Sequence, residues 1–338
     1  MKLRALAFAA LLALPPQAGL AWNAAGHRLS AEIAWQQLDD ATRAKIARLL
    51  RAHPDYERWL ARGKGETPEH SAFVEASTWP DDIRRDPRFH HAGSEAPTAP
   101  LPGFPDMERH RQWHFADRPL GHVPRPAAGE KNKGIAAEEG ELEPRLADLL
   151  KTLGNARAGL AARAYALPWL IHLVGDAHQP LHVVSRYDAD GRGDAGGNAL
   201  TVATPFHPRL PTMKLHAYWD DLPGAPWLRG PRLEAAARAL RELHPPPAVA
   251  GTPEQWLAES WRIARDSAYP PGDDAVPTID PAFHENAQEI ARRRVAEAGY
   301  RLANVLRDAL GKTRPPKQNG PLHLERAPDA GAEKTSRN

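Results

Sequence analysis

Residues 171–182 read Ile171-His172-Leu173-Val174-Gly175-Asp176-Ala177-His178-Gln179-Pro180-Leu181-His182. The apolar surroundings indicate a buried helix, on which His172 and Asp176, four positions apart, share one face. Pro180 should end this helix, so that His182 follows just past its C-terminus. Burying these polar groups unpaired would be costly, and imidazole with carboxylate is a ligand set that zinc uses. The stretch therefore predicts a metal site at a helix C-terminus; the alternative is a set of hydrogen-bonded core histidines.

Four shorter motifs elsewhere combine histidine or aspartate with tryptophan. One repeats the His-x3-Asp spacing, and the others place Trp before Asp or His: they are His216-Ala217-Tyr218-Trp219-Asp220, Trp79-Pro80-Asp81, Trp113-His114-Phe115-Ala116-Asp117 and Trp22-x4-His27. Each motif alone is ambiguous, because a tryptophan beside a polar residue is often only a half-buried anchor. Together with residues 171–182 they supply further candidate metal ligands.

The rest of the chain has a mainly helical pattern. Apolar residues recur at helical spacing over 30–50, and the pattern returns at 141–153, 157–179, 232–243, 253–267 and 281–311. Pro168 predicts a kink or a new helix start within 157–179. Only 199–204 has the character of a strand. We therefore expect an all-α fold with long loops and at most a small β-hairpin near 199–204.

The chain is expected to form one domain. No internal repeat or clear linker divides it, and the segments rich in proline and glycine are interpreted as loops. The domain should span residues 22–312. Residues 313–338 lack apolar periodicity, which predicts a disordered tail.

Composition excludes several classes of protein. The 338 residues are 42% hydrophobic and 25% charged, which suits a sizeable folded core. Mean hydropathy is −0.56 and no apolar run is long enough for a membrane span, so no membrane insertion is expected. Cysteine is absent, which excludes disulfides, thiolate metal sites and thiol catalysis. Any bound metal must therefore use imidazole and carboxylate.

The N-terminal segment has the features of a secretory signal peptide, residues 1–21. Lys2 and Arg4 precede an apolar stretch, and small residues occupy positions −3 and −1 before the junction of Ala21 and Trp22. Cleavage there predicts export, to a periplasm or out of the cell; the alternative is an apolar first helix. Two of the 44 Lys and Arg residues lie in this segment, so 42 remain against 42 Asp and Glu. A polyanionic substrate would then be attracted by local cations rather than by net charge.

Taken in order, the motifs resemble those of the zinc-dependent, single-strand-specific nucleases, also called 3′-nucleotidases, of the S-one/P-one type. The resemblance runs from Trp22 to the last predicted helix, and residues 171–182 are its most specific part. This family belongs to an all-α superfamily shared with the bacterial zinc phospholipases C. The resemblance implies a single mainly helical domain of that type and a centre of three zinc ions.

The resemblance also implies how the three ions are held. One ion would be bound by Asp81, His114, His172 and Asp176. A second would be bound by the α-amino group and carbonyl of Trp22, by His27 and by Asp176, which would bridge the pair. The third would be bound by His182, His216 and Asp220. Because the amine of Trp22 is free only after cleavage, export would be coupled to activation.

Four residues match substrate positions of the family. Arg84 matches a phosphate-contacting arginine, whose planar fork suits the transition state; the alternative is a surface salt bridge. Phe115 and Asp117 match an aromatic residue that stacks on a base and a carboxylate that hydrogen-bonds it; the alternative for Phe115 is core packing. Stacking tolerates base variation and explains a preference for single strands. Asn198 matches a residue of the phosphate pocket, and Arg84, Asp176 and Asn198 are the implied catalytic residues.

The implied activity is that of an exported trinuclear-zinc nuclease. Zinc-bound hydroxide would attack phosphorus and break the P–O3′ bond of single-stranded RNA and DNA, releasing 5′-mononucleotides, and 3′-nucleotides would lose their phosphate. A monomer is expected, with these substrates and no protein as partners.

Two alternatives remain open. A zinc phospholipase C-like phosphodiesterase would share the core motif but would carry Glu where Asp220 stands. A non-catalytic exported zinc-binding protein would need the ligands but not Arg84, Phe115 or Asp117. The Pro-rich stretch 86–110 departs from the family pattern and could act as a lid over the site.

Overall fold

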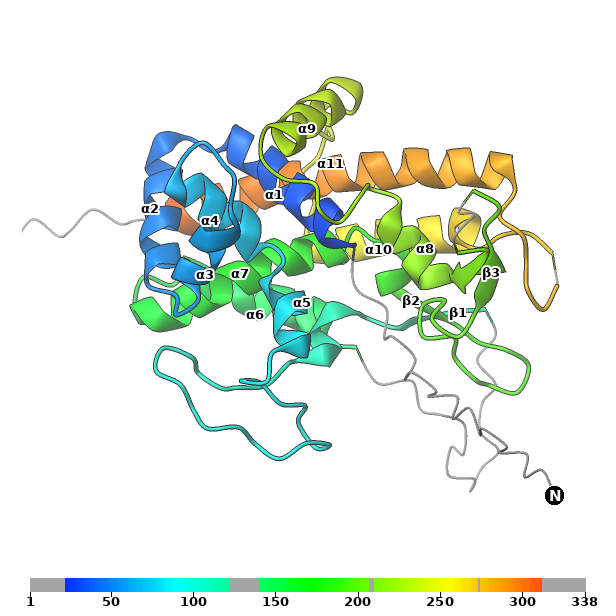
Figure 1. Cartoon of the computed structure of the whole chain (residues 1–338), viewed down its shortest axis with the longest axis horizontal. Coiled ribbons are helices and arrows are strands. Elements are labelled where there is room, and N and C mark those ends of the chain that lie inside the picture. The colour runs from blue at the N-terminus through cyan, green and yellow to red at the C-terminus, as the bar shows by residue number, and fades with distance from the viewer. Residues whose placement is uncertain (1–21, 122–139, 207–209, 273, 312–338) are drawn as a thin grey trace, which may run out of the picture.

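A computed structural model describes residues 22–121, 140–206, 210–272 and 274–311 (Figure 1). The predicted signal peptide (1–21) and tail (313–338) lie outside these residues. Helices dominate the described chain, which contains only two small sheets, so the prediction of a mainly helical fold is confirmed. Among the helices in this part of the chain, none has both the length and the apolar character needed to cross a membrane.

The helical elements follow one another with short or irregular connections. In the first half of the chain they are α1 (Ala24–Gln37), α2 (Asp40–Arg51), α3 (Tyr56–Arg62), α4 (Pro68–Ala76), α5 (Trp79–Asp82), η1 (Ile83–Arg85), η2 (Arg111–His114) and α6 (Leu142–Gly154). In the second half they are α7 (Leu160–Asp176), η3 (Pro180–His182), α8 (Leu215–Asp221), α9 (Pro231–Leu243), α10 (Pro253–Ile263), the π-helical turn η4 (Ala264–Ala268) and α11 (Pro281–Gly311).

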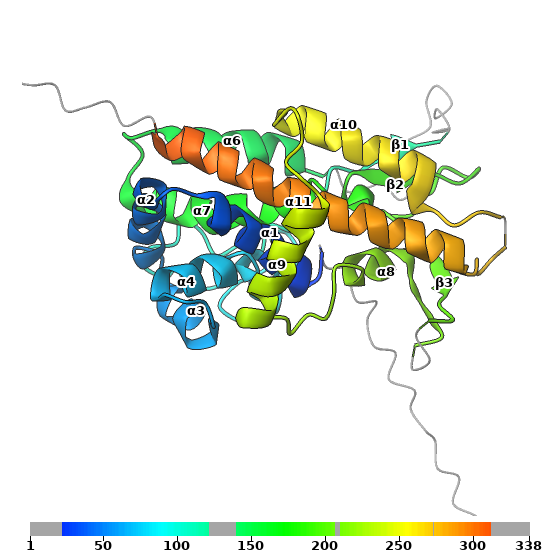
Figure 2. The same cartoon turned by 90° about the horizontal axis from the view of Figure 1, so that it is seen from above.

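Helix α11 is the longest element and organises the others. It has 31 residues and runs along most of the molecule, with α1 crossing it and α6 and α7 packed against it (Figures 1 and 2). Gly299 allows the close approach of α1, because a Cβ atom there would lie only 2.6 Å from the Cβ of Ile33. The position of α1 sets where its first turn, which carries His27, meets the rest of the protein.

Two apolar clusters fill the interior. One gathers residues of α2, α4, α6 and α7 around the buried Trp59 and Trp169. The other gathers residues of α8, α9 and α11 around the buried Trp22 and Trp219. Helix α1 contributes to both clusters, so burial of apolar surface fixes it between the two halves of the core.

Two helix boundaries differ from the sequence-based expectation. The apolar pattern of 30–50 spans two helices, because Leu38 is extended and Asp39 caps α2 by accepting a 2.8 Å hydrogen bond from the Thr42 amide. Helix α7 continues through Pro168, so no new helix begins there. Every residue of 164–176 is buried, and this packing outweighs the roughly 3 kcal/mol that proline costs a helix interior.

The two sheets each contain two strands. Strands β3 (Thr201–Ala203) and β4 (Thr212–Lys214) are antiparallel, which confirms a hairpin near 199–204. Strands β1 (Arg118–Leu120) and β2 (Val184–Arg186) pair in parallel, and the sequence did not predict this second sheet. Three-residue strands carry too little periodicity to be recognised. Their pairing continues a contact in which the Ala116 amide donates to the His182 carbonyl at 2.8 Å. It therefore ties together the chain segments that follow η2 and η3.

Candidate metal centre

Eight of the nine predicted ligands are side chains that come from six helical elements. They are His27 of α1, Asp81 of α5, His114 of η2, His172 and Asp176 of α7, His182 of η3, and His216 and Asp220 of α8. All are buried except Asp81, whose side chain is 14% exposed. The last turn of α7 lies at the centre of this arrangement.

The structure brings these eight side chains into three groups. His27, Asp81 and His172 form one group, His114, His172 and Asp176 a second, and His182, His216 and Asp220 a third. Within each group one ligand atom per residue lies within 4.8 Å of the others. His172 belongs to two groups, and the ring of His27 stacks on it with centroids 3.8 Å apart. The first two groups thus form one continuous patch, while the third stands apart as a separate set of residues.

The third group has the hydrogen-bond geometry of a cation site. His182 Nδ1 lies 2.6 Å from the His114 carbonyl oxygen, and His216 Nδ1 lies 2.7 Å from the Gly196 carbonyl oxygen. A carbonyl can only accept, so both Nδ1 atoms carry hydrogen and each neutral ring presents a lone pair at Nε2. These two Nε2 atoms face each other at 3.1 Å, with Asp220 Oδ2 3.7 Å from that of His216. Two lone pairs and a carboxyl group at such distances suit a bound cation.

His172 shows the same arrangement in the first two groups. Its Nδ1 lies 2.7 Å from the Ser77 carbonyl oxygen, so its Nε2 presents a lone pair. That Nε2 lies 3.0 Å from His114 Nδ1, 3.4 Å from Asp176 Oδ2 and 3.9 Å from Asp81 Oδ1. The backbone of α4–α5 therefore aims this imidazole at the shared patch.

Several buried atoms of the centre make no hydrogen bond to any described residue. They are both ring nitrogens of His27, His114 Nε2, Asp176 Oδ1 and Asp220 Oδ2. Buried polar atoms in proteins almost always have a hydrogen-bond partner or bind an ion, so a bound metal ion would account for these unpartnered atoms. Imidazole nitrogens with carboxylate oxygens suit Zn²⁺.

Electrostatics lead to the same conclusion. Burial raises the pKa of Asp176 and Asp220 well above the usual range, and neighbouring carboxylates raise it further. Burial also lowers the pKa of His27, His114 and His182 well below the usual range. Neutral imidazoles are the form that binds metal, and a bound cation compensates the ionised carboxylates.

Trp22 lies beside α1 and α8, two of the helices that carry candidate ligands. Its side chain is fully buried, and the next residue, Asn23, donates its amide to the Asp220 carbonyl at 3.0 Å. The Asn23 side chain caps α1 by accepting from the Ala25 amide at 2.9 Å. The chain at Trp22 is therefore held between α8, which carries Asp220, and α1, which carries His27.

Arg84 lies at the edge of the patch. Its Nη1 is 3.4 Å from Asp81 Oδ1, and its side chain is 12% exposed. Burial is the main cause of the lowered pKa of His114, and the charge on Arg84 lowers it further. A largely buried guanidinium beside the candidate ligand Asp81 differs from a surface salt bridge, which was the alternative for this residue.

Phe115 and Asp117 lie one and three residues after the candidate ligand His114. Phe115 is half-buried in extended backbone and belongs to neither apolar cluster, which disfavours the core-packing alternative. Asp117 has φ of 49°, a left-handed conformation uncommon outside glycine. Such conformations concentrate at functional sites because the surrounding fold must enforce them.

Asn198 lies beside the third group. Its amide nitrogen donates to the Ala195 carbonyl at 2.8 Å, within a turn whose Gly196 presents its own carbonyl to His216. Gly196 has φ of 61°, and a Cβ atom there would lie 2.1 Å from the Leu181 carbonyl oxygen, so only glycine fits. The turn thus fixes His216 and places Asn198 within three residues of a ligand-orienting carbonyl.

Sequence reasoning missed the residues that orient the ligands. Gln179 donates to Asp220 Oδ1 at 2.8 Å and accepts from the Leu181 amide, a role that its place in the central motif could have suggested. The Ser77 carbonyl has no sequence signature. His178 faces away: its Nδ1 lies 2.7 Å from the Val174 carbonyl and its Nε2 2.9 Å from Arg301 Nη1, so it is structural.

Comparison with known families gives one result. A family model described as S1/P1 nuclease matches residues 22–311, well over half of the chain. No match was found among curated proteins. The matched span contains all the candidate ligands.

Proposed function

The chain belongs to the S1/P1 nuclease family and is thus a nuclease, and we propose that it uses three zinc ions to hydrolyse single-stranded RNA and DNA. The products would be 5′-mononucleotides, and 3′-nucleotides would lose their phosphate. Residues 22–312 form the proposed catalytic domain, exported after removal of residues 1–21.

One observation carries the metal proposal. The lone pairs of His182 and His216 face each other at 3.1 Å because two backbone carbonyls fix the opposite ring nitrogens. Neutral rings would repel in this orientation, and a cation between them removes the repulsion. The orphaned atoms of His27 and Asp176 support further ions in the shared patch. The amine of Trp22 is proposed as an additional ligand once the preceding segment is removed.

The residues around the ions have distinct proposed tasks. When bound, zinc supplies a Lewis acid that polarises the phosphate and promotes ionisation of water. Arg84 would bind the non-bridging phosphate oxygens, which its planar fork fits while charge develops on them. Phe115 would stack on an unpaired base and Asp117 would hydrogen-bond its edge, so that paired bases are excluded. Asn198 would hold the phosphate on the side of His216.

The deciding experiment uses protein that begins at Trp22. It is incubated with single-stranded RNA, single-stranded DNA and a 3′-nucleotide, with zinc and after chelation, and the products are identified by mass. Zinc-dependent release of 5′-mononucleotides is the expected result. If zinc-loaded, folded protein hydrolyses none of these but cleaves a choline phospholipid, the nuclease proposal is wrong and the phospholipase alternative holds.

A further inference from the structure

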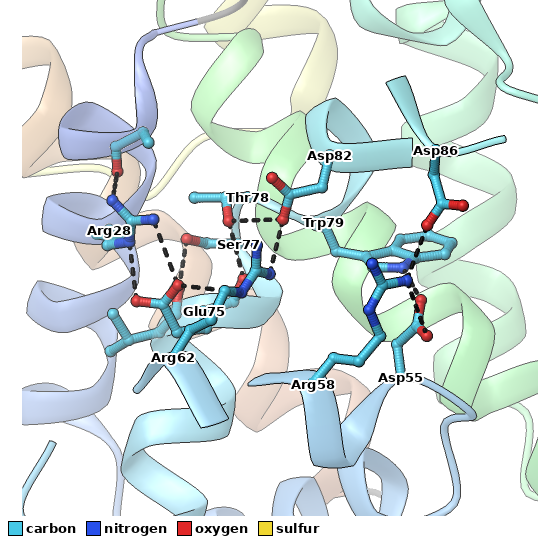
Figure 3. Close-up of polar contacts among 12 residues, drawn as sticks. Arg28, Asp55, Arg58, Arg62, Glu75, Ser77, Thr78, Trp79, Asp82 and Asp86 are labelled. Carbon is cyan, nitrogen blue, oxygen red and sulfur yellow. Dashed lines mark hydrogen bonds and ion pairs between the residues drawn. The ribbon is translucent and has the colours of Figure 1, made fainter. Parts of the chain in front are cut away.

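Two arginines converge on a buried carboxylate of α4, the helix that precedes the turn to Asp81. Glu75, near the end of α4, is 1% exposed and accepts hydrogen bonds from two arginines. Arg28 donates through Nε at 3.0 Å and Nη2 at 3.3 Å, and Arg229 donates through Nε at 2.8 Å and Nη2 at 3.4 Å. Arg62 Nε adds an ion pair at 3.9 Å, and Figure 3 shows Glu75 between Arg28 and Arg62.

The residues of this cluster come from segments that carry metal ligands. Arg28 follows His27 directly in α1. Glu75 precedes Ser77, whose carbonyl orients His172, and Asp81 follows in α5. None of the cluster's own side chains belongs to the three ligand groups. The cluster can therefore act on the metals only through the placement of the ligands.

Further hydrogen bonds make these connections stiff. Arg28 Nη1 donates to the Pro226 carbonyl at 2.8 Å, which attaches the segment after α8 to α1. Arg62 Nη2 donates to Asp82 Oδ2 at 2.7 Å, and Thr78 Oγ1 donates to the Glu75 carbonyl at 3.1 Å (Figure 3). The turn between α4 and α5, which supplies the Ser77 carbonyl, is thereby held at both ends.

A charge buried in this way fixes geometry strongly. Guanidinium groups bind a carboxylate through planar forks, so their orientation and distance are both defined. Removing the carboxylate charge would leave Arg28 and Arg229 without this counter-ion. The chain segments that carry the two arginines would then move so that water could solvate the guanidinium groups. A displacement of a few tenths of an ångström is enough to spoil a zinc site, whose bond lengths tolerate roughly 0.2 Å.

The third ligand group has anchors of its own. Gln179 holds the Asp220 carboxylate, and only the Asp220 backbone carbonyl is tied to α1, through the amide of its cap Asn23. The orienting carbonyls of His182 and His216 belong to His114 and Gly196, which do not contact the Glu75 cluster through any hydrogen bond in the described residues. Loss of Glu75 should therefore affect the groups unequally.

We propose that Glu75 is a positioning residue for the metal centre, which holds α1 and the α4–α5 turn in register so that His27, Asp81 and His172 meet at one site. The proposal rests on the proposed function only for the identity of the ion as zinc.

The test is Glu75→Gln in the full chain that begins at Trp22. Zinc binding is measured by titration against a competing chelator, and cobalt(II) binding by its visible spectrum. His27→Ala and His216→Ala serve as references that assign each class of site. The zinc sites that His27→Ala weakens are called the His27 class, and those that His216→Ala weakens the His216 class. We expect zinc affinity at the His27 class to fall roughly 10- to 100-fold, while affinity at the His216 class changes by less than about twofold. Raising zinc should restore kcat without changing KM, because Glu75 touches no substrate.

The matched control is Glu259→Gln. Glu259 also joins two buried arginines, Arg294 at 2.8 Å and Arg301 at 2.6 Å. It connects α10 with α11, which carry no candidate ligand, and among the described residues the hydrogen bonds of its arginines reach the motif of residues 171–182 at His178 and not α1 or the α4–α5 turn. Glu259→Gln should lower thermal stability without a selective loss of affinity at the His27 class of site. If Glu75→Gln does not fold, Arg229→Gln removes one partner only and should give a smaller shift at the same class of site.

Three results would overturn the proposal: unchanged zinc affinity in folded Glu75→Gln, equal weakening of both classes, or the same selective loss in Glu259→Gln. The titration needs no nuclease activity. A wild-type protein that binds zinc selectively but cleaves no nucleic acid would therefore refute the proposed function and leave this test intact.

Discussion

Gly175 allows the candidate ligand His27 to lie close to the end of α7, where the candidate ligand Asp176 is found. It lies in the last turn of α7, one residue before Asp176, and a Cβ atom placed there would lie 2.8 Å from His27 Nδ1 and 3.0 Å from His27 Cε1. Gly175→Ala therefore tests whether the position of the His27 ring matters, without removing any ligand.

The two expected effects of Gly175→Ala have opposite signs. Alanine in a helix is more stable than glycine by up to about 1 kcal/mol, so the helix itself should gain. Ordinary contact begins near 3.4 Å, so the His27 ring must retreat by about 0.6 Å. That displacement is roughly three times the tolerance of a zinc–nitrogen bond. We expect zinc affinity at the His27 class of site to fall at least tenfold, about 1.4 kcal/mol, while zinc-free stability stays within about 1 kcal/mol of wild type.

The assay combines zinc titration against a chelator with thermal unfolding in excess chelator. Gly154→Ala is the control, because Gly154 also ends a helix but a Cβ there would find its nearest neighbour at 3.8 Å. That variant should keep every zinc site. The reasoning is refuted if Gly175→Ala binds zinc at the His27 class as tightly as wild type does.

Four other changes give separate tests. His172→Ala should abolish turnover, because His172 belongs to two ligand groups, and atomic absorption should show fewer zinc ions per chain; full activity would contradict the assignment. In excess chelator, burial holds the pKa of Asp220 in the folded protein above its value near 4 in the unfolded chain. The folded protein therefore loses stability as the pH rises above about 4, because Asp220 ionises more easily in the unfolded chain. Asp220→Asn should therefore be more stable than wild type at pH 7, with a difference that shrinks toward pH 4 in thermal melts; a pH-independent difference would count against this. Phe115→Ala should raise KM for a single-stranded oligonucleotide roughly 5- to 150-fold with zinc content unchanged, whereas an unaffected KM would exclude stacking. One extra residue before Trp22 should weaken zinc binding and activity; an equally active extended protein would exclude the amine as a ligand.

Much of the fold could be predicted because helices are local. The apolar spacing of α9 and α11 follows directly from the sequence, and the structure gives helices at 231–243 and 281–311. The prediction was less complete where tertiary contacts decide the helix boundaries and the strand pairing. The cap at Asp39 divides one periodic pattern into two helices, and packing carries α7 through Pro168. The pair β1–β2 is too short to have a pattern of its own.

The candidate site divides in the same way. Residues four apart on one helix, such as His172 with Asp176 or His216 with Asp220, must share a face, so their pairing was visible in the sequence. The stacking of His27 on His172 was not, because those residues meet only when α1 crosses the core beside α7. The Glu75 cluster could not be predicted from the sequence either, because the two arginines that donate to Glu75 lie 47 and 154 residues away along the chain.

The kinds of candidate ligand, their spacing within each helix and the mainly helical fold can be predicted from the sequence, because they depend on side-chain chemistry and on local periodicity. Tertiary contacts set how the candidate ligands group and which ring nitrogen His172, His182 and His216 present. Those choices depend on the carbonyls of Ser77, His114 and Gly196, which lie on other segments of the chain. Burial of apolar surface sets the distances between such segments, and no local pattern encodes them.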